Sequence, residues 1–187
     1  MGDFRLAGPT LKFPESVLIP SAAVGMLVGG WLHTAGTSLA GGMGVLAGLA
    51  LWTLAEYLLH RFIVHGIDPF RSWHLEHHRH PEVPMRTPIM FSVLMVLTLA
   101  GMPLFLWSDR GEALALSCGL MLGHVVQEVV HYRLHWAEPC GKVWLAARWR
   151  HHDFHHHADD GLAFGTLSAV WDRLLGTQPS RRAMLHR

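Results

Sequence analysis

Four long apolar stretches constrain this chain more than any other feature of its sequence. They cover residues 16–32, 36–59, 88–107 and 112–130. A helix that crosses the hydrocarbon core of a bilayer needs about 20 mostly apolar residues, with a range of roughly 17 to 25. The sequence therefore predicts an all-α integral membrane protein with four transmembrane helices. Within the second stretch, Gly44 and Gly48 either let another helix approach closely or belong to an ordinary glycine-rich membrane helix.

The composition agrees with a membrane protein. Charged residues make up 16% of the 187 residues, against about 25% in soluble domains, and the mean hydropathy is +0.24. A formal net charge of +1, with no basic run interleaved with aromatic residues, argues against nucleic-acid binding. Cys118 and Cys140 are too few for a disulfide framework or a thiolate metal site. We expect a single membrane domain over residues 1–187.

The distribution of positive charge predicts the orientation of the spans. The chain has 15 Lys and Arg residues, and only Arg110 lies in the two connections, 31–36 and 108–111, that join the first span to the second and the third to the fourth. Because connections rich in Lys and Arg stay on the cytoplasmic side, both termini are expected in the cytoplasm.

Histidine is unusually abundant, at 16 residues, and ten histidines fall into four sequence clusters. HRFIVH contains His60 and His65, HLEHH contains His74, His77 and His78, HYRLH contains His131 and His135, and HDFHH contains His152, His155 and His156. The predicted topology places all four clusters at the cytoplasmic ends of the second and fourth spans or in the segments that follow, 60–87 and 131–177. These segments are expected to form a helical, histidine-rich cytoplasmic cap.

The spacing inside the clusters suits metal binding. Residues three or four apart share one face of a helix, so HLEHH, HYRLH and HDFHH can each present paired imidazoles. His60 and His65 are five apart, which corresponds to about 500° of rotation on a regular α-helix. That pair is therefore expected to serve two different metals or to bracket the end of the helix.

Ten clustered imidazoles imply two metal ions, because one ion rarely takes more than six ligands. Imidazole suits zinc, copper, iron and nickel, so the donor set alone does not choose the metal. Each ligand ring needs its other nitrogen held by a carboxylate or carbonyl. Glu56, four residues before His60, and Glu128, three before His131, are the expected partners, with a simple interfacial position as the alternative. We expect no catalytic residue beyond the metal ligands.

A metal transporter or metal-buffering membrane protein is the alternative from another functional class. Transporters place their sites near the bilayer midplane on broken helices. The histidines of this chain instead cluster at the ends of the predicted spans and beyond them, which favours an enzyme.

The clusters HRFIVH, HLEHHRHP, HYRLH and HDFHH resemble, in this order, the motifs of the fatty acid hydroxylase and sterol desaturase superfamily. The segment FGTLSAVWDRLLGT, residues 164–177, resembles the close of the fatty acid hydroxylases, and the four-residue gap in HRFIVH also resembles that branch. The resemblance implies an O2-dependent membrane oxidoreductase of lipid biosynthesis. Two iron ions held by the ten histidines would serve to hydroxylate an unactivated C–H bond of a lipid acyl chain, and zinc could replace iron in a purified sample.

The resemblance leaves alternatives within the superfamily. EYLLHRFIVHG with HLEHHRHP also resembles the carotenoid hydroxylases, so a carotenoid or sterol-type hydroxylase or desaturase is the second interpretation. The chain has no GxGxxG dinucleotide motif and no haem motif, so a separate electron donor on the cytoplasmic side is expected. The substrate cavity is expected between the second and fourth spans, around Trp52, Tyr57, Leu120 and His124.

Overall fold

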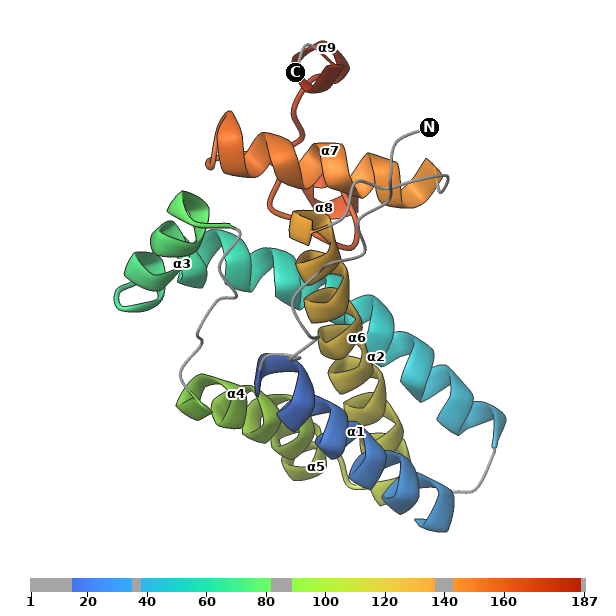
Figure 1. The fold of residues 1–187 in the computed structure, drawn as a ribbon. Helices are drawn as coiled ribbons and strands as arrows, with labels where there is room; N and C mark the ends of the chain where they lie inside the picture. The colour runs from blue at the N-terminus through green and yellow to red at the C-terminus, as the bar shows by residue number, and fades with distance from the viewer. Residues whose placement is uncertain (1–14, 35–37, 82–88, 137–142, 186–187) are drawn as a thin grey trace, which may run out of the picture.

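The fold is built around one long helix, α6 (Arg110–Trp136), which packs against both α1 (Glu15–Thr34) and α2 (Leu39–Leu58) (Figure 1). The computed structural model describes all residues except 1–14, 35–37, 82–88, 137–142 and 186–187. Every regular element among the described residues is a helix. Three short apolar elements follow one another along the chain: α4 (Ile89–Val96), the π-helix η2 (Leu97–Gly101) and α5 (Met102–Leu106). Helix α4 packs against α1, whereas η2 and α5 pack against α6. The predicted all-α class is confirmed.

Three of the four predicted spans are helices long and apolar enough to cross a membrane. They cover Val17–Thr34, Leu39–Val64 and Arg110–His135. The predicted span 88–107 corresponds to a shorter apolar helix, Phe91–Leu106, which contains the π-helical turn of η2 and Pro103. The predicted boundaries at residues 36 and 88, and Cys140, lie outside the described residues.

Glycines bring α2 and α6 into backbone contact. A Cβ atom on Gly48 would collide with the Leu116 carbonyl oxygen, and would lie 2.8 Å from the Cα atom of Gly119. A Cβ atom on Gly44 would lie 3.0 Å from the Ala115 side chain. Helices in a membrane associate through such close packing at small residues. Lipid tails are as apolar as the helix surfaces, so the hydrophobic effect does not drive the helices together. Of the two interpretations of Gly44 and Gly48, the close-approach one is confirmed.

The outer surface of the bundle is apolar. Phe105 is 87% exposed, Leu39 is 83% exposed and Met26 is 73% exposed. A soluble protein rarely exposes so many large apolar side chains together. The interior beneath them contains Leu27, Trp52, Leu99 and Met121. This arrangement suits helices whose outer faces contact hydrocarbon.

The histidine-bearing elements gather at one end of the bundle. The π-helix η1 (Leu59–Val64) continues α2 and leads to α3 (Phe70–Arg79). Helix α7 (Val143–His157) lies across this end, α8 (Val170–Leu174) lies between α7 and the bundle, and α9 (Arg181–Leu185) lies beyond α7 (Figure 1). All four histidine clusters therefore come from elements that meet at the same end.

The close approach of α2 and α6 generates the first prediction. Replacement of Gly48 by Leu should force the two backbones apart, because the new side chain meets the α6 backbone rather than a movable side chain. We expect a loss of about 3 kcal/mol of stability, in the range of overpacked cores, measured by thermal unfolding in detergent. Gly42→Leu is the matched control, since nothing lies within 4 Å of its Cβ position. Equal unfolding temperatures for the two variants would contradict the close packing.

Candidate metal centre

Ten histidines converge in two neighbouring groups. The first histidine group contains five residues whose candidate ligand atoms all lie within 4.8 Å of one another: His60, His65, His74, His78 and His155. The second is built in the same way from His77, His131, His135 and His156. His152 adjoins the second group, because its Nε2 atom lies 3.0 Å from Nε2 of His135. These are the ten histidines that the sequence clusters predicted as metal ligands.

The π-helix η1 brings His60 and His65 into the same group. In a π-helix the backbone N–H of one residue bonds to the carbonyl five residues earlier, and the His65 N–H donates to the His60 carbonyl at 3.0 Å. Residues five apart therefore lie about one turn apart and face the same side. The expectation that these two rings lie well apart, based on a regular α-helix, is wrong for this reason. The alternative, that the pair brackets the end of the helix, is confirmed, because η1 ends at Val64 and His65 follows it. Both rings belong to the first histidine group.

The spacing of the ring nitrogens fits a cation between them. The Nε2 atoms of His60 and His74 lie 3.0 Å apart, as do those of His65 and His155 and those of His131 and His135. Two imidazole nitrogens about 2.1 Å from one metal ion, at right angles to each other, are about 3.0 Å apart. The arrangement thus has the dimensions of neighbouring ligands in a coordination shell.

Backbone carbonyls fix the orientation of two ligand rings. The Nδ1 atom of His60 lies 2.6 Å from the Phe164 carbonyl oxygen, and Nδ1 of His155 lies 2.7 Å from the Leu162 carbonyl oxygen. Since a carbonyl only accepts hydrogen bonds, each Nδ1 carries the proton and each Nε2 keeps a free lone pair. Both nitrogens of His156 are buried without a hydrogen-bond partner. A group of bare lone pairs facing one another fits a bound metal ion.

Burial keeps the rings of the cap neutral. Desolvation lowers the pKa of His77 to about 4, of His78 to about 3 and of His155 to about 2. It also lowers the pKa of His156. These rings therefore carry no charge at pH 7, and neutral imidazole is the form that binds metal ions.

One face of α2 and η1 holds the C-terminal segment 162–177 in place. Thr53 accepts a hydrogen bond from the Trp171 indole at 2.9 Å, and Tyr57 bonds to the Thr177 hydroxyl at 3.0 Å. The buried Glu56 carboxylate accepts the Thr166 amide at 2.6 Å and the Leu167 amide at 3.3 Å. Glu56, Tyr57 and His60 lie three, four and seven residues after Thr53, so these four side chains share one helical face.

Asp172 organises the same segment from inside. It is fully buried and accepts hydrogen bonds from the amides of Phe164 and Gly165, at 2.9 and 3.0 Å. The Thr177 hydroxyl and the His151 ring also bond to its carboxylate, at 2.8 and 3.1 Å. Burial alone would raise the pKa of Asp172, but hydrogen bonds from His151, Thr177 and Gly165 hold this pKa below its usual range. The carboxylate stays ionised and fixes the loop whose carbonyl orients His60.

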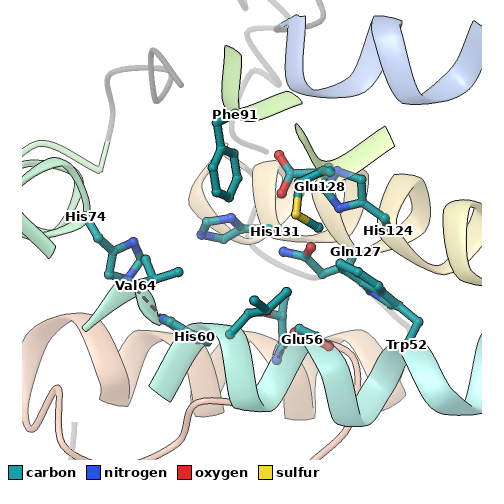
Figure 2. Close-up of a pocket in the computed structure, with 13 residues that line it drawn as sticks. Trp52, Glu56, His60, Val64, His74, Phe91, His124, Gln127, Glu128 and His131 are labelled. Carbon is teal, nitrogen blue, oxygen red and sulfur yellow. Dashed lines mark hydrogen bonds between the residues drawn. The ribbon is translucent and has the colours of Figure 1, made fainter. Parts of the chain in front are cut away.

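A cavity of about 90 Å³ adjoins the histidines on the side of the helical bundle (Figure 2). Trp52, Phe91 and Met95 form apolar parts of its wall, and His60, His74 and His131 line it from the metal centre. Gln127, Glu128 and His124 of α6 add polar groups. The cavity therefore connects an apolar space between helices to both histidine groups.

The structure refines the residues expected around this cavity. Trp52 and His124 line it, and their rings lie 4.9 Å apart. Tyr57 and Leu120 are buried but do not line it, because Tyr57 bonds to the C-terminal segment and Leu120 belongs to the apolar core. The third apolar stretch contributes Phe91 and Met95 instead.

The two carboxylates expected beside the ligands take different positions. Glu56 does not hold a ring directly: it binds the amides of Thr166 and Leu167, close to the Phe164 carbonyl that orients His60. Glu128 lines the cavity with His124 and His131. Phe164, Asp172 and Thr177 had no expected role, although all three belong to the segment FGTLSAVWDRLLGT that resembles a family motif.

Fold and site together define a helical protein of membrane type whose polyhistidine groups fit metal binding. A family model described as fatty acid hydroxylase matches residues 45–177. A dihydroceramide fatty acyl 2-hydroxylase of Arabidopsis thaliana is 33% identical over 153 residues, covering 74% of this chain and 62% of the relative. The fatty acid 2-hydroxylase of Homo sapiens is 31% identical over 139 residues, covering 68% of this chain and 37% of the relative.

A solved structure shares the fold. The hydroxylase domain of scs7p, the visible part of that full-length protein, superimposes with a TM-score of 0.73 at 26% identity, covering 89% of this chain and 67% of that one. The chain belongs to the fatty acid hydroxylase family. It spans less than two thirds of the length of the curated relatives compared above.

Removal of one histidine from each group tests the metal centre. A His155→Ala, His156→Ala variant deletes one ligand atom from the first group and one from the second. We expect about two metal ions per chain in the parent after iron-supplemented expression and mild detergent extraction, and a loss of more than half in the variant. His33→Ala, His80→Ala is the matched control, because both of these histidines are exposed outside the two groups. Equal metal content in the two variants would contradict the assignment.

Replacement of Asp172 by Asn tests the anchor of the loop. The amide keeps one acceptor oxygen where the carboxylate serves four donors, so at least one buried donor loses its partner. We expect a loss of about 3 kcal/mol, measured by thermal unfolding, together with a lower metal content. Asp109→Asn removes the same charge from an exposed position at the other end of α6, where the Asn side chain can still accept the Glu112 amide, and should change neither. Normal unfolding and full metal content for Asp172→Asn would show that the loop does not depend on this anchor.

Proposed function

We propose that this protein is an O2-dependent membrane enzyme that hydroxylates an unactivated C–H bond in the acyl chain of a lipid. The observation that carries the proposal is the cavity that joins the apolar helices to the two histidine groups. Membership in the fatty acid hydroxylase family supports it, and so do the relatives, which are fatty acid and dihydroceramide fatty acyl 2-hydroxylases.

The proposed cofactor is a pair of iron ions, held by the ten histidines of the two groups. Bound iron would supply the oxidising chemistry with O2 that no side chain of the chain can provide. Each group has fewer than six imidazoles, so each ion would keep room for a further ligand. Zinc also suits imidazole donors and would compete for the same sites during purification.

The contribution of the protein is to bind, orient and exclude water. Trp52, Phe91 and Met95 offer an apolar wall against which an acyl chain can lie, and burial of that chain removes it from water. His60 and His155 are held by backbone carbonyls, so the ligand geometry is fixed before substrate enters. Glu56 and Asp172 support that geometry through segment 162–177. The reaction needs no nucleophilic side chain.

The proposed topology is one domain over residues 1–187 with four membrane segments, the third being the short apolar helix Phe91–Leu106. The uneven distribution of Lys and Arg supports cytoplasmic termini and a metal centre that faces the cytoplasm. The segments 60–87 and 131–177 would form the cytoplasmic cap. Electrons would come from a separate donor on that side, since the chain has no recognisable flavin, nicotinamide or haem motif.

Product analysis under labelled oxygen tests the proposal. Cells that produce the parent protein with added iron should accumulate acyl chains whose new hydroxyl group carries oxygen from ¹⁸O2, measured by mass spectrometry after lipid hydrolysis. His78→Ala should lower that product at least about tenfold, whereas His33→Ala, outside both groups, should not. An iron-loaded parent that yields no labelled acyl product would contradict the proposal. A labelled carotenoid or sterol would move the assignment to that branch of the superfamily.

A further inference from the structure

A second cavity, of about 290 Å³, lies between α7 and α9 and is strongly basic. Four arginines line it: Arg148, Arg150, Arg173 and Arg181. Helix α7 separates α9 from the bundle of α1, α2 and α6, so this cavity opens on the side of the cap away from the apolar helices (Figure 1). It is distinct from the cavity in Figure 2 and shares no lining residue with it.

The positive charge of this cavity is only partly balanced within the described part of the chain. Arg150, Arg173 and Arg181 are exposed, and none of them forms an ion pair with a described carboxylate. Arg148 is buried, one of its N–H groups donates to the Gly165 carbonyl at 3.4 Å, and the buried Asp172 carboxylate attracts its charge. A guanidinium group has five N–H donors, so Arg148 keeps several for another partner. The three exposed arginines around the same cavity have no such counter-charge, which favours an anion among them.

The arginines are the groups that the wall of this cavity offers to a ligand. His151 is 1% exposed, its Nε2 atom bonds to Asp172 at 3.1 Å, and its Nδ1 atom is buried. The Oε1 atom of Gln178 is also buried. The guanidinium N–H groups are hydrogen-bond donors that carry positive charge, so a ligand that fits this site offers anionic oxygens.

We propose that the cavity between α7 and α9 binds a soluble phosphomonoester, with the arginine N–H groups on the phosphate oxygens. The planar N–H donors of arginine match the spacing of phosphate oxygens and form paired, charge-assisted hydrogen bonds. A phosphomonoester carries close to two negative charges at pH 7, so several guanidinium groups can share one phosphate group. The position of the cavity away from the apolar helices favours a soluble ligand over a lipid headgroup.

The site is connected to the metal centre through hydrogen bonds. His151 bonds to Asp172, Asp172 accepts the Phe164 amide, and the Phe164 carbonyl holds the His60 ring. Arg148 contacts the neighbouring Gly165 carbonyl. A ligand in the cavity therefore touches residues that fix the loop beside the first histidine group. This inference does not depend on the hydroxylase activity, because it rests on a different cavity and on binding alone.

Binding of inorganic phosphate and of glycerol 3-phosphate tests the proposal directly. Isothermal titration of the full chain in detergent, in phosphate-free buffer, should show saturable binding of one ligand per chain. The Arg150→Gln, Arg173→Gln variant should bind about tenfold more weakly, a loss expected when two charge-assisted partners are removed. Arg71→Gln, Arg182→Gln changes the net charge equally at exposed positions that do not line the cavity, and should bind as the parent does.

Four outcomes would overturn the proposal. Absence of saturable binding up to roughly 10 mM, where Kd values correspond to less than about 3 kcal/mol, would reject a phosphate site, and so would equal weakening in both double variants. Sulfate that binds as tightly as phosphate would show that the cavity takes any small dianion, and would reject a site for phosphomonoesters. In nanodiscs, phosphatidic acid that abolishes phosphate binding, when phosphatidylcholine does not, would reassign the ligand to a lipid headgroup. Phosphate binding that survives in both membranes supports the soluble ligand.

Discussion

Two buried carboxylates hold the C-terminal segment where the histidine groups require it. Glu56 binds the amides of Thr166 and Leu167, and Asp172 binds those of Phe164 and Gly165. Four consecutive amides of one loop are thus bound by two carboxyl groups shielded from water, and hydrogen bonds to an ionised partner such as Asp172 are among the stronger ones in proteins. The loop in turn presents the carbonyl that fixes His60. Without this anchor, α2 and the segment 162–177 would lose their common geometry.

The histidine groups destabilise the fold without a metal ion and would stabilise it with one bound. Nε2 of His60 and Nε2 of His155 each hold a free lone pair about 3 Å from another ring nitrogen, and several ring nitrogens are buried without partners. A cation among them would convert this cost into ligand bonds. Metal binding would then contribute to the free energy of folding, as it does in other metal-dependent folds.

The sequence predicted the all-helical class and the histidines that come together, because helical spacing and Lys and Arg asymmetry are local signals. The prediction from sequence failed where the structure departs from regular helical geometry or depends on residues far apart in the chain. The π-helix η1 turns His65 toward His60, and no residue type in HRFIVH distinguishes a π-helix from an α-helix. The role of Tyr57 was missed because its partner, Thr177, lies 120 residues away. Phe91 and Met95 entered the cavity through packing of α4, which apolar composition alone does not specify.

The order of the ligands along the chain has a consequence for synthesis. His60 and His65 are made first, and both groups stay incomplete until His155 and His156, some ninety residues later. At translation rates of about 5 to 20 residues per second, the early histidines wait roughly 5 to 20 s for their partners. The first two apolar helices must therefore be in place before a complete group can form. Metal ions held by the two groups would therefore bind only after His155 and His156 have been made, which makes the proposed metal centre a late product of assembly.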